Sequence, residues 1–344
     1  QLVDNDTMGE HQEFTADEIT VTGKEWKKYT LTITSPQTID DAHLRLFLSH
    51  EQGEAFEEKL TTIDVEHVSL FPTDTWKGRE NGMRKDLAQA LNDLHPGVFR
   101  FPGGCIVEGT DLETRYQWKN SVGPVENRPT NENRWENCFD YRLYPDYYQS
   151  YGLGFFEYFQ LCEDFGCEAL PILHVGLACQ FQNETGGKPD MEAHVAVSDL
   201  DPYIQDALDL IEFANGPADS KWGKVRADAG HPEPFGLKYL GLGNEEKITP
   251  EFEERFRYIY EKVVAAHPEI VIVGTAGPGS HPGNGDFEEG WKFATELNVP
   301  ILDEHYYEQR TYFQTSRQYD SYPRDRQTKV YLGEYAAKDK KLID

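Results

Sequence analysis

The 344-residue sequence contains no apolar run that approaches the roughly 20 residues of a membrane-spanning helix. It is also poor in basic residues: 33 Lys and Arg stand against 61 Asp and Glu, which gives a formal charge of -28. Binding to nucleic acid or to anionic lipid depends on clustered Lys and Arg, because these side chains displace the counterions of phosphates. We therefore expect no nucleic acid and no membrane among the partners, and a neutral ligand fits the charge better.

Metal-binding and nucleotide-binding motifs are missing as well. The five cysteines are odd in number and show no CxxC or zinc-ribbon spacing. No HExxH is present, and the segment LGLGNEE (residues 240–246) lacks the third glycine of a dinucleotide loop and carries acid where a phosphate would lie. We expect no cofactor and no metal. No charged-then-apolar leader precedes Gln1, which leaves open a cytoplasmic protein or a removed leader; we favour a secreted or periplasmic protein.

Residues 1–72 have the pattern of short antiparallel strands. The segments EITVT (18–22), WKKYTLTITS (26–35), AHLRLFLSH (42–50) and LTTIDVEHVSLF (60–71) alternate apolar and polar residues. Clusters of Gly, Pro and Asp separate them, as expected for strands with one wet face. This pattern predicts part of a β-sandwich.

Residues 73–344 have a different rhythm, in which strands alternate with helix-period segments. Helices are predicted at 83–94, 148–166, 202–216 and 250–268, and strands at 97–104, 168–176, 237–245, 270–277, 299–307 and 329–337. Strand and helix in alternation predict an α/β domain whose parallel strands are joined by crossover helices.

Polar side chains or glycines gather where each predicted strand ends. In an eight-unit barrel, and in an open doubly wound sheet too, the loops after these ends form the active site. The residues of interest are Arg100, Cys105, His174, Asn244, Glu245, Glu246, His305, Tyr306, Tyr307 and Glu334.

Glu245 and Glu334 each follow an apolar strand, and together they fit the chemistry of glycosidic bonds. Such bonds are commonly cut by two carboxylic residues, one protonating the leaving oxygen while the other attacks the sugar or activates water. The alternative is structural, in which either Glu caps a helix or pairs with an Arg. Arg100, within an apolar strand, is costly to bury without a carboxylate partner, so we infer that it keeps a nucleophile ionised. Asn244 offers an amide that can donate to a sugar hydroxyl.

The segment DEHYY (303–307) places His305 and Tyr307 on one face of a strand. Both could line a pocket, or both could be buried core groups with satisfied hydrogen bonds. Asp303 shares their face and could complete a metal cluster with His305, but no third ligand has recognisable spacing.

Five motifs in order give the sequence a family resemblance. FRFPGGCIVEG (99–109), YQWKNSVGPVENRP (116–129), LGLGNEE (240–246), DEHYY (303–307) and YLGEYA (331–336) resemble the α-L-arabinofuranosidases of glycoside hydrolase family 51. The resemblance runs from about residue 68 to residue 337, and it is to the branch with a carbohydrate-binding-like sandwich ahead of the barrel. It implies a (β/α)8 TIM barrel in which the six strands predicted here are strands 2 to 7.

The resemblance also implies residue roles. Glu245 would be the acid/base and Glu334 the nucleophile, steadied by Arg100. Asn244 would bind a sugar hydroxyl, and His305 and Tyr307 would surround the arabinofuranose. Cys105 stands where many bacterial relatives have Asn, so it is a substrate-binding candidate that departs from the family. Glu246 has no implied role.

Two further departures concern the ends of the barrel. The family's first strand, with another substrate-binding Glu, and its eighth strand and C-terminal β-sandwich are not found, so the sequence is interpreted as an internal fragment. Strands 2 to 7 alone would leave two edges, so the strands of Arg100 and Glu334 are expected to flank a gap about two strands wide.

The expected activity is that of a retaining exo-glycosidase. It would release terminal α-L-arabinofuranosyl residues from arabinan, arabinoxylan or arabino-oligosaccharides by double displacement, with carboxyl groups about 5 Å apart. Its partner would thus be an arabinose-containing polysaccharide or oligosaccharide. Two alternatives stay open: an endo-β-glucanase or xylanase on the same barrel, and a non-catalytic carbohydrate-binding fragment.

Overall fold

The structure is a computed structural model that describes residues 2–4, 13–38, 42–46, 63–135, 148–179, 194–279 and 281–338. The chain forms two compact units, Gln1–Val68 and Ser69–Asp344. Within the described residues, no helix combines the length and the hydropathy of a membrane-spanning segment.

The first unit contains a small antiparallel sheet. Its strands are β1 (Leu2–Asp4), β2 (Glu13–Thr15) and β3 (Ala42–Leu44), in the order β2-β1-β3. The strands predicted at 18–22 and 26–35 are wrong, because residues 16–38 form no regular element and Trp26 is 69% exposed. Alternation provides a strand with an apolar face, but a strand also needs a hydrogen-bonded neighbour.

In the predicted strand 42–50, residues 42–44 form β3 and the described residues 45–46 are irregular, as are residues 63–71 of the strand predicted at 60–71. Residues 47–50 and 60–62 lie outside the described part. Among the described residues of the range 1–72, one three-stranded sheet represents the predicted sandwich.

The second unit is built on a sheet of six parallel strands. These are β4 (Val98–Phe101), β7 (Glu168–Leu173), β8 (Tyr239–Leu242), β9 (Val271–Thr275), β10 (Ile301–Glu308) and β11 (Lys329–Ala337). Their order in the sheet is β11-β10-β9-β8-β7-β4. Each strand of this sheet therefore lies beside the strand that precedes or follows it along the chain. The six predicted strands are confirmed. Within the described residues β4 and β11 are the sheet edges, as predicted.

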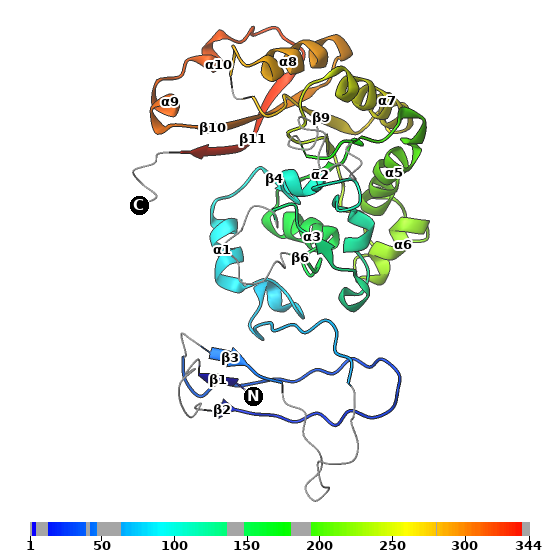
Figure 1. The fold of residues 1–344 in the computed structure, drawn as a ribbon, viewed down its shortest axis with the longest axis vertical. Coiled ribbons are helices and arrows are strands. Elements are labelled where there is room, and N and C mark those ends of the chain that lie inside the picture. Colours follow the sequence, from blue (N-terminus) through cyan, green and yellow to red (C-terminus); the bar gives the residue numbers. More distant parts are fainter. Residues whose placement is uncertain are drawn as a thin grey trace, which may run out of the picture. The chain divides into compact units, whose positions relative to one another are not determined.

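Helices lie around this sheet and at the ends of its strands. They are α1 (Lys85–Asp93), α2 (Cys105–Glu108), α3 (Phe155–Phe165), α5 (Asp201–Asn215), α6 (Lys221–Asp228), α7 (Pro250–Ala266), α8 (Gly285–Leu297), α9 (Arg310–Thr315) and α10 (Gln318–Ser321). Short 3-10 turns occur at η1 (Trp76–Gly78), η2 (Trp118–Ser121), η3 (Val125–Asn127) and η5 (Val197–Asp199). In Figure 1, α5, α7 and α8 follow one another around the strands.

The four predicted helices are confirmed as α1, α3, α5 and α7, with one correction. Residues 148–154, predicted as the start of α3, are not helical, and Tyr148–Gln149 forms β6, which pairs with β5 (Asn131–Glu132). The helix begins only after Gly154, whose N–H donates to Glu157 Oε2 at 2.8 Å. Glycine favours such a boundary because it lowers helix propensity.

Local signals set the ends of the longer helices. Thr249 caps α7 by accepting a hydrogen bond from Phe252 N at 3.3 Å, and Pro250 occupies the first turn, where its missing N–H costs nothing. Asn284 caps α8 in the same way through Asp286 N, and α8 ends at Asn298 in the left-handed conformation. Helix α8, although capped, was not among the predicted helices.

Aromatic side chains fill the space between helices and sheet. The largest fully buried side chains in this layer include Phe101, Phe155, Phe159, Phe213 and Trp118. Trp118 comes from the motif at 116–129, and its Nε1 donates to Asp206 O of α5 at 3.0 Å. Many of the aromatic side chains are therefore part of the hydrophobic core.

Strand β10 separates this core from the interior of the barrel. Glu304 and Tyr306 point outward, where Glu304 accepts hydrogen bonds from Tyr306, from Trp291 of α8 (2.8 Å) and from Tyr322 (2.5 Å). Asp303 and His305, one residue out of phase, point inward. The alternation predicted for DEHYY is confirmed. Tyr306 was a residue of interest because it stands near a strand end, but it lies on the outer face, away from the site.

Candidate active site

The inward side chains of β4, β8, β10 and β11 meet where these strands end. The pairing of β10 with β11 shifts by one residue, from Glu304↔Leu332 to His305↔Glu334, so Gly333 is an extra residue. Its N–H donates to Asp303 Oδ1 at 2.7 Å, and a Cβ at this position would lie 2.3 Å from the same oxygen. Only glycine fits this bulge, and the bulge brings Glu334 beside His305.

Arg100 connects the four strands. Its guanidinium donates to Asp303 Oδ2 at 3.0 Å, to Glu334 Oε1 at 2.9 Å and to Asn244 Oδ1 at 2.8 Å. The side chain is only 7% exposed. Burial alone would lower the pKa of Arg100, but Asp303 and Glu334 outweigh it and raise that pKa above its ordinary value.

Glu245 and Glu334 face each other across a short gap. One carboxylate oxygen of each lies within 4.8 Å of the other and of a His305 ring nitrogen. Glu334 Oε2 accepts a hydrogen bond from Tyr307 at 2.7 Å. Gly104 makes room for this carboxylate, because a Cβ there would lie 2.5 Å from Glu334 Oε1.

Glu245 is held by His305 and Cys105. His305 Nδ1 lies 2.9 Å from Glu245 Oε1, and Cys105 Sγ lies 3.7 Å from Glu245 Oε2. The thiol of Cys105 therefore contacts a carboxylate of the site, and it does so from the first residue of α2.

His305 is a buried imidazole among carboxylates. Burial lowers its pKa, but the hydrogen bonds to Asp303 and Glu245 and the nearby charge of Glu334 raise the pKa to about 9. His305 is then an imidazolium at neutral pH. With Arg100 it supplies the positive charge that allows several carboxylates to ionise in one buried place.

Two further carboxyl groups lie behind Asn244. Glu108 accepts hydrogen bonds from Asn244 Nδ2 at 3.0 Å and from Glu245 N at 3.4 Å, and Glu246 accepts one from Asn244 N at 2.7 Å. Both are fully buried. Burial, with their mutual repulsion, raises the pKa of Glu108 well above its ordinary value, and burial raises the pKa of Glu246 to about 7.

Glu108 was missed by the sequence reasoning. It stands in the motif FRFPGGCIVEG, three residues after the Cys105 that was considered, and the signal was an acid in a predominantly apolar run. Glu246 was noted without a role. In the structure both orient the backbone or side chain of the Asn244-Glu245 pair, and His174, also noted, bonds the Glu108 carbonyl through Nε2 at 3.1 Å.

The seven candidate residues predicted for the site gather at one place. They are Arg100, Cys105, Asn244, Glu245, His305, Tyr307 and Glu334, and Asp303 lies with them. Asp303, considered as a metal ligand with His305, instead accepts hydrogen bonds from Arg100 and Gly333. Glu245, His305 and Glu334 have ligand atoms close enough for a metal, but Arg100 and His305 already pair with the two carboxylates.

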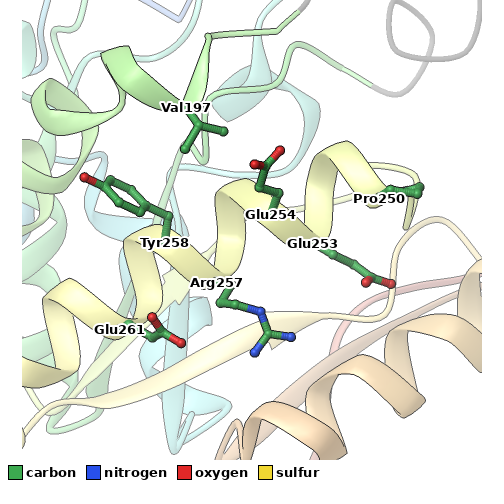
Figure 2. A pocket seen from close by; sticks show the side chains of 7 residues that line it. All are labelled: Val197, Pro250, Glu253, Glu254, Arg257, Tyr258 and Glu261. Atoms are coloured by element: carbon green, nitrogen blue, oxygen red, sulfur yellow. The ribbon is translucent and has the colours of Figure 1, made fainter.

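A separate depression lies on the outer side of α7 (Figure 2). Its lining combines the acidic Glu253, Glu254 and Glu261 with Arg257 and Tyr258. These helical positions face away from the strand ends and contribute nothing to the carboxylate pair.

Comparison with known proteins identifies the family. The model of the α-L-arabinofuranosidase 1 domain matches residues 90–324. An extracellular exo-α-L-arabinofuranosidase of Streptomyces chartreusis is 42% identical over 335 residues, which cover 94% of this chain and 37% of that protein. The chain belongs to the family 51 α-L-arabinofuranosidases.

Two further comparisons agree. Alpha-L-arabinofuranosidase 1 of Arabidopsis thaliana is 35% identical over 258 residues, covering 75% of this chain and 33% of that protein. A solved arabinose-bound GH51 α-L-arabinofuranosidase superposes with a TM-score of 0.61 at 32% identity, over 76% of this chain and 37% of that one. The likeness and the parallel, nearly closed sheet show a TIM-barrel fold. The chain spans about a third of the length of these curated relatives.

The raised pKa of His305 predicts how the stability from its ion pairs changes with pH. Its pKa is raised from 6.5 to about 9, so the stabilisation from its ion pairs is complete below pH 6.5 and is lost as the pH rises through 9. In nitrogen-15 NMR of the full chain, His305 should titrate near pH 9. Asp303→Asn should move the midpoint towards 6.5, since one carboxylate is removed. His305→Gln identifies the resonance, and a neutral His305 at pH 7 would contradict the assignment.

Proposed function

We propose that this family 51 chain carries the catalytic pair of a retaining exo-α-L-arabinofuranosidase, with Glu334 as nucleophile and Glu245 as acid/base. The observation that carries the proposal is the separation of the two carboxylates, with oxygens within 4.8 Å. Retaining glycosidases have carboxyl groups about 5 to 5.5 Å apart, whereas inverting enzymes leave room for a water between carboxylate and sugar.

The contacts of Glu334 suit a nucleophile. Arg100 and Tyr307 each donate a hydrogen bond to one of its oxygens, which favours the ionised form. Attack on the anomeric carbon needs one oxygen to leave its partner. Tyr307 is 40% exposed, so its hydroxyl can turn to the incoming sugar when the ester forms.

The contacts of Glu245 suit an acid that later acts as a base. His305 Nδ1 lies 2.9 Å from Glu245 Oε1, so the imidazole is a proton donor beside the carboxyl group that would protonate the leaving oxygen. Once Glu334 is esterified, its negative charge disappears from a point 3.7 Å from His305. The loss of a nearby charge lowers the pKa of Glu245, which then takes a proton from the water that frees the sugar.

Sugar binding would fall to Asn244, Cys105, His305 and Tyr307. Asn244 already uses its amide N–H on Glu108 and one lone pair of Oδ1 on Arg100. Its second lone pair on Oδ1 can accept from a sugar hydroxyl. Cys105, as a thiol, would donate only weakly to the sugar.

The substrate and location follow the relatives' names. Terminal α-L-arabinofuranosyl groups of arabinan, arabinoxylan or arabino-oligosaccharides are the proposed substrates, because the named relatives are α-L-arabinofuranosidases and one is an extracellular exo-enzyme. Secretion is proposed for this chain on the same ground. The strong negative charge does not favour nucleic acid or membrane partners.

Substrate preference provides the first test. The complete gene product should hydrolyse an aryl α-L-arabinofuranoside and leave a soluble β-glucan and an unsubstituted xylan intact, since the named relatives are α-L-arabinofuranosidases. The products are followed by release of the aryl group and of reducing ends. Cleavage of the glucan or xylan would favour the endo-acting alternative, and binding of arabinosides without turnover would favour a non-catalytic module.

Glu334→Ala tests the nucleophile. Turnover should fall by several orders of magnitude, and azide should restore part of it, because the small anion fills the space of the lost carboxylate. The product should be a glycosyl azide of inverted configuration, identified by NMR. Glu304→Ala is a matched control, since it removes a buried Glu from the outer face of the neighbouring strand. Rescue of that variant, or none of Glu334→Ala, counts against the assignment.

Glu245→Ala tests the acid/base. It should retain far more activity on aryl arabinosides with a good leaving group than on natural oligosaccharides, because a good leaving group needs little protonation. The two substrates are compared by kcat/KM in wild type and variant. Equal losses on both would show that Glu245 does not protonate the leaving oxygen.

A further inference from the structure

Two thiols and a carboxyl group form a cluster directly behind Glu245. Cys105 Sγ, Cys179 Sγ and one carboxyl oxygen of Glu108 all lie within 4.8 Å of one another, and all three side chains are buried. The cysteines are far apart in sequence. They meet because the loop after β7 runs beside α2, where Cys179 N donates to Gly109 O at 3.2 Å.

We propose that this cluster is a binding site for a thiophilic d10 cation such as Zn²⁺ or Cd²⁺. On a tetrahedral zinc with bonds of about 2.3 Å to sulfur and about 2.1 Å to oxygen, neighbouring ligand atoms lie about 3.5 to 3.8 Å apart. Since the three atoms lie within 4.8 Å of one another, they need to approach by about 1.3 Å at most to reach this geometry. Two sulfurs also select against Mg²⁺ and Ca²⁺, which take oxygen ligands.

The cluster offers three protein ligands and leaves the fourth position open. Glu245 Oε2 lies 3.7 Å from Cys105 Sγ, so its carboxylate is the neighbouring group that can fill this position. Binding would also draw Glu108 away from Asn244 Nδ2, which it now holds at 3.0 Å. A bound cation would therefore take Glu245 as a ligand, so that it can no longer act as the acid/base, and would break the hydrogen bond of Asn244 to Glu108.

Two consequences follow, and they rest on different grounds. Binding depends only on the geometry of Cys105, Glu108 and Cys179. Inhibition rests on the proposed function, because it requires Glu245 to be the acid/base. A cation at Glu245, His305 and Glu334 is disfavoured by comparison, since Arg100 and His305 already place positive charge there.

The experiment titrates the reduced full chain with CdCl₂ and follows the ultraviolet thiolate-to-cadmium absorption. Wild type should saturate with one tightly bound cadmium, and MgCl₂ should give no band. Cys179→Ser removes one sulfur without altering a residue of the sugar pocket, and it should weaken cadmium binding by at least about tenfold. Cys162→Ser is the matched control, because it removes a buried thiol of α3 and should bind cadmium as wild type does.

Activity on an aryl arabinoside provides the second measurement. Cadmium should inhibit wild type and Cys162→Ser alike, with recovery on chelation, whereas Cys179→Ser should keep its basal activity and resist cadmium. Equal absorption and equal inhibition in Cys179→Ser would overturn the site. If no arabinoside is turned over at all, the proposed function fails while the absorption still decides binding. Cys179→Ala replaces the serine variant if circular dichroism shows that the latter does not fold.

Discussion

A single buried guanidinium constrains the whole site. Arg100 lies inside the barrel, where an uncompensated charge would cost several kcal/mol, so carboxylates must surround it. Its partners come from three other strands: Asp303 from β10, Glu334 from β11 and Asn244 from the end of β8. Because β4 and β11 are opposite edges of the sheet, these contacts also fix how the sheet curls. The requirement to neutralise one cation thus positions the two edges and the candidate nucleophile together.

The surplus of acid around this cation is resolved by protonation. Arg100 and a protonated His305 balance the carboxylates that face the gap, and the raised pKa of His305 is the result of that balance. Glu108 and Glu246 lie one layer further in, where burial raises their pKa values, which favours the neutral forms. A neutral carboxyl can still orient Asn244 and the backbone of its neighbour by hydrogen bonding. The same residue type therefore serves as a charge in one layer and as a neutral support in the next.

Sequence predicts the second unit well and the first unit poorly for one physical reason. A buried parallel strand is a continuous apolar run that ends in polar or glycine residues, and β8 in KYLGLGNEE shows both signals within nine residues. The strands predicted at 18–22 and 26–35 rest on alternation alone, which carries no information about a pairing neighbour. Helix α8 was missed although Asn284 and Asn298 mark its ends. Its apolar positions recur with helical spacing as clearly as those of α5 and α7, so the signal was present and was overlooked.

The candidate site was predictable as far as strand ends are predictable. Glu245 and Glu334 could be brought together from sequence because parallel strands end at one rim. The bulge at Gly333 could not be predicted, because it depends on the register between two strands. Without the bulge, His305 would face Gly333 in place of Glu334. Cys105 and Cys179 show the limit most clearly. Spacing rules find metal sites within one short segment, whereas this pair is assembled by α2 and by the loop after β7, which lie side by side. A barrel rim thus creates ligand sets as readily as it creates catalytic pairs, and only the loop geometry distinguishes them.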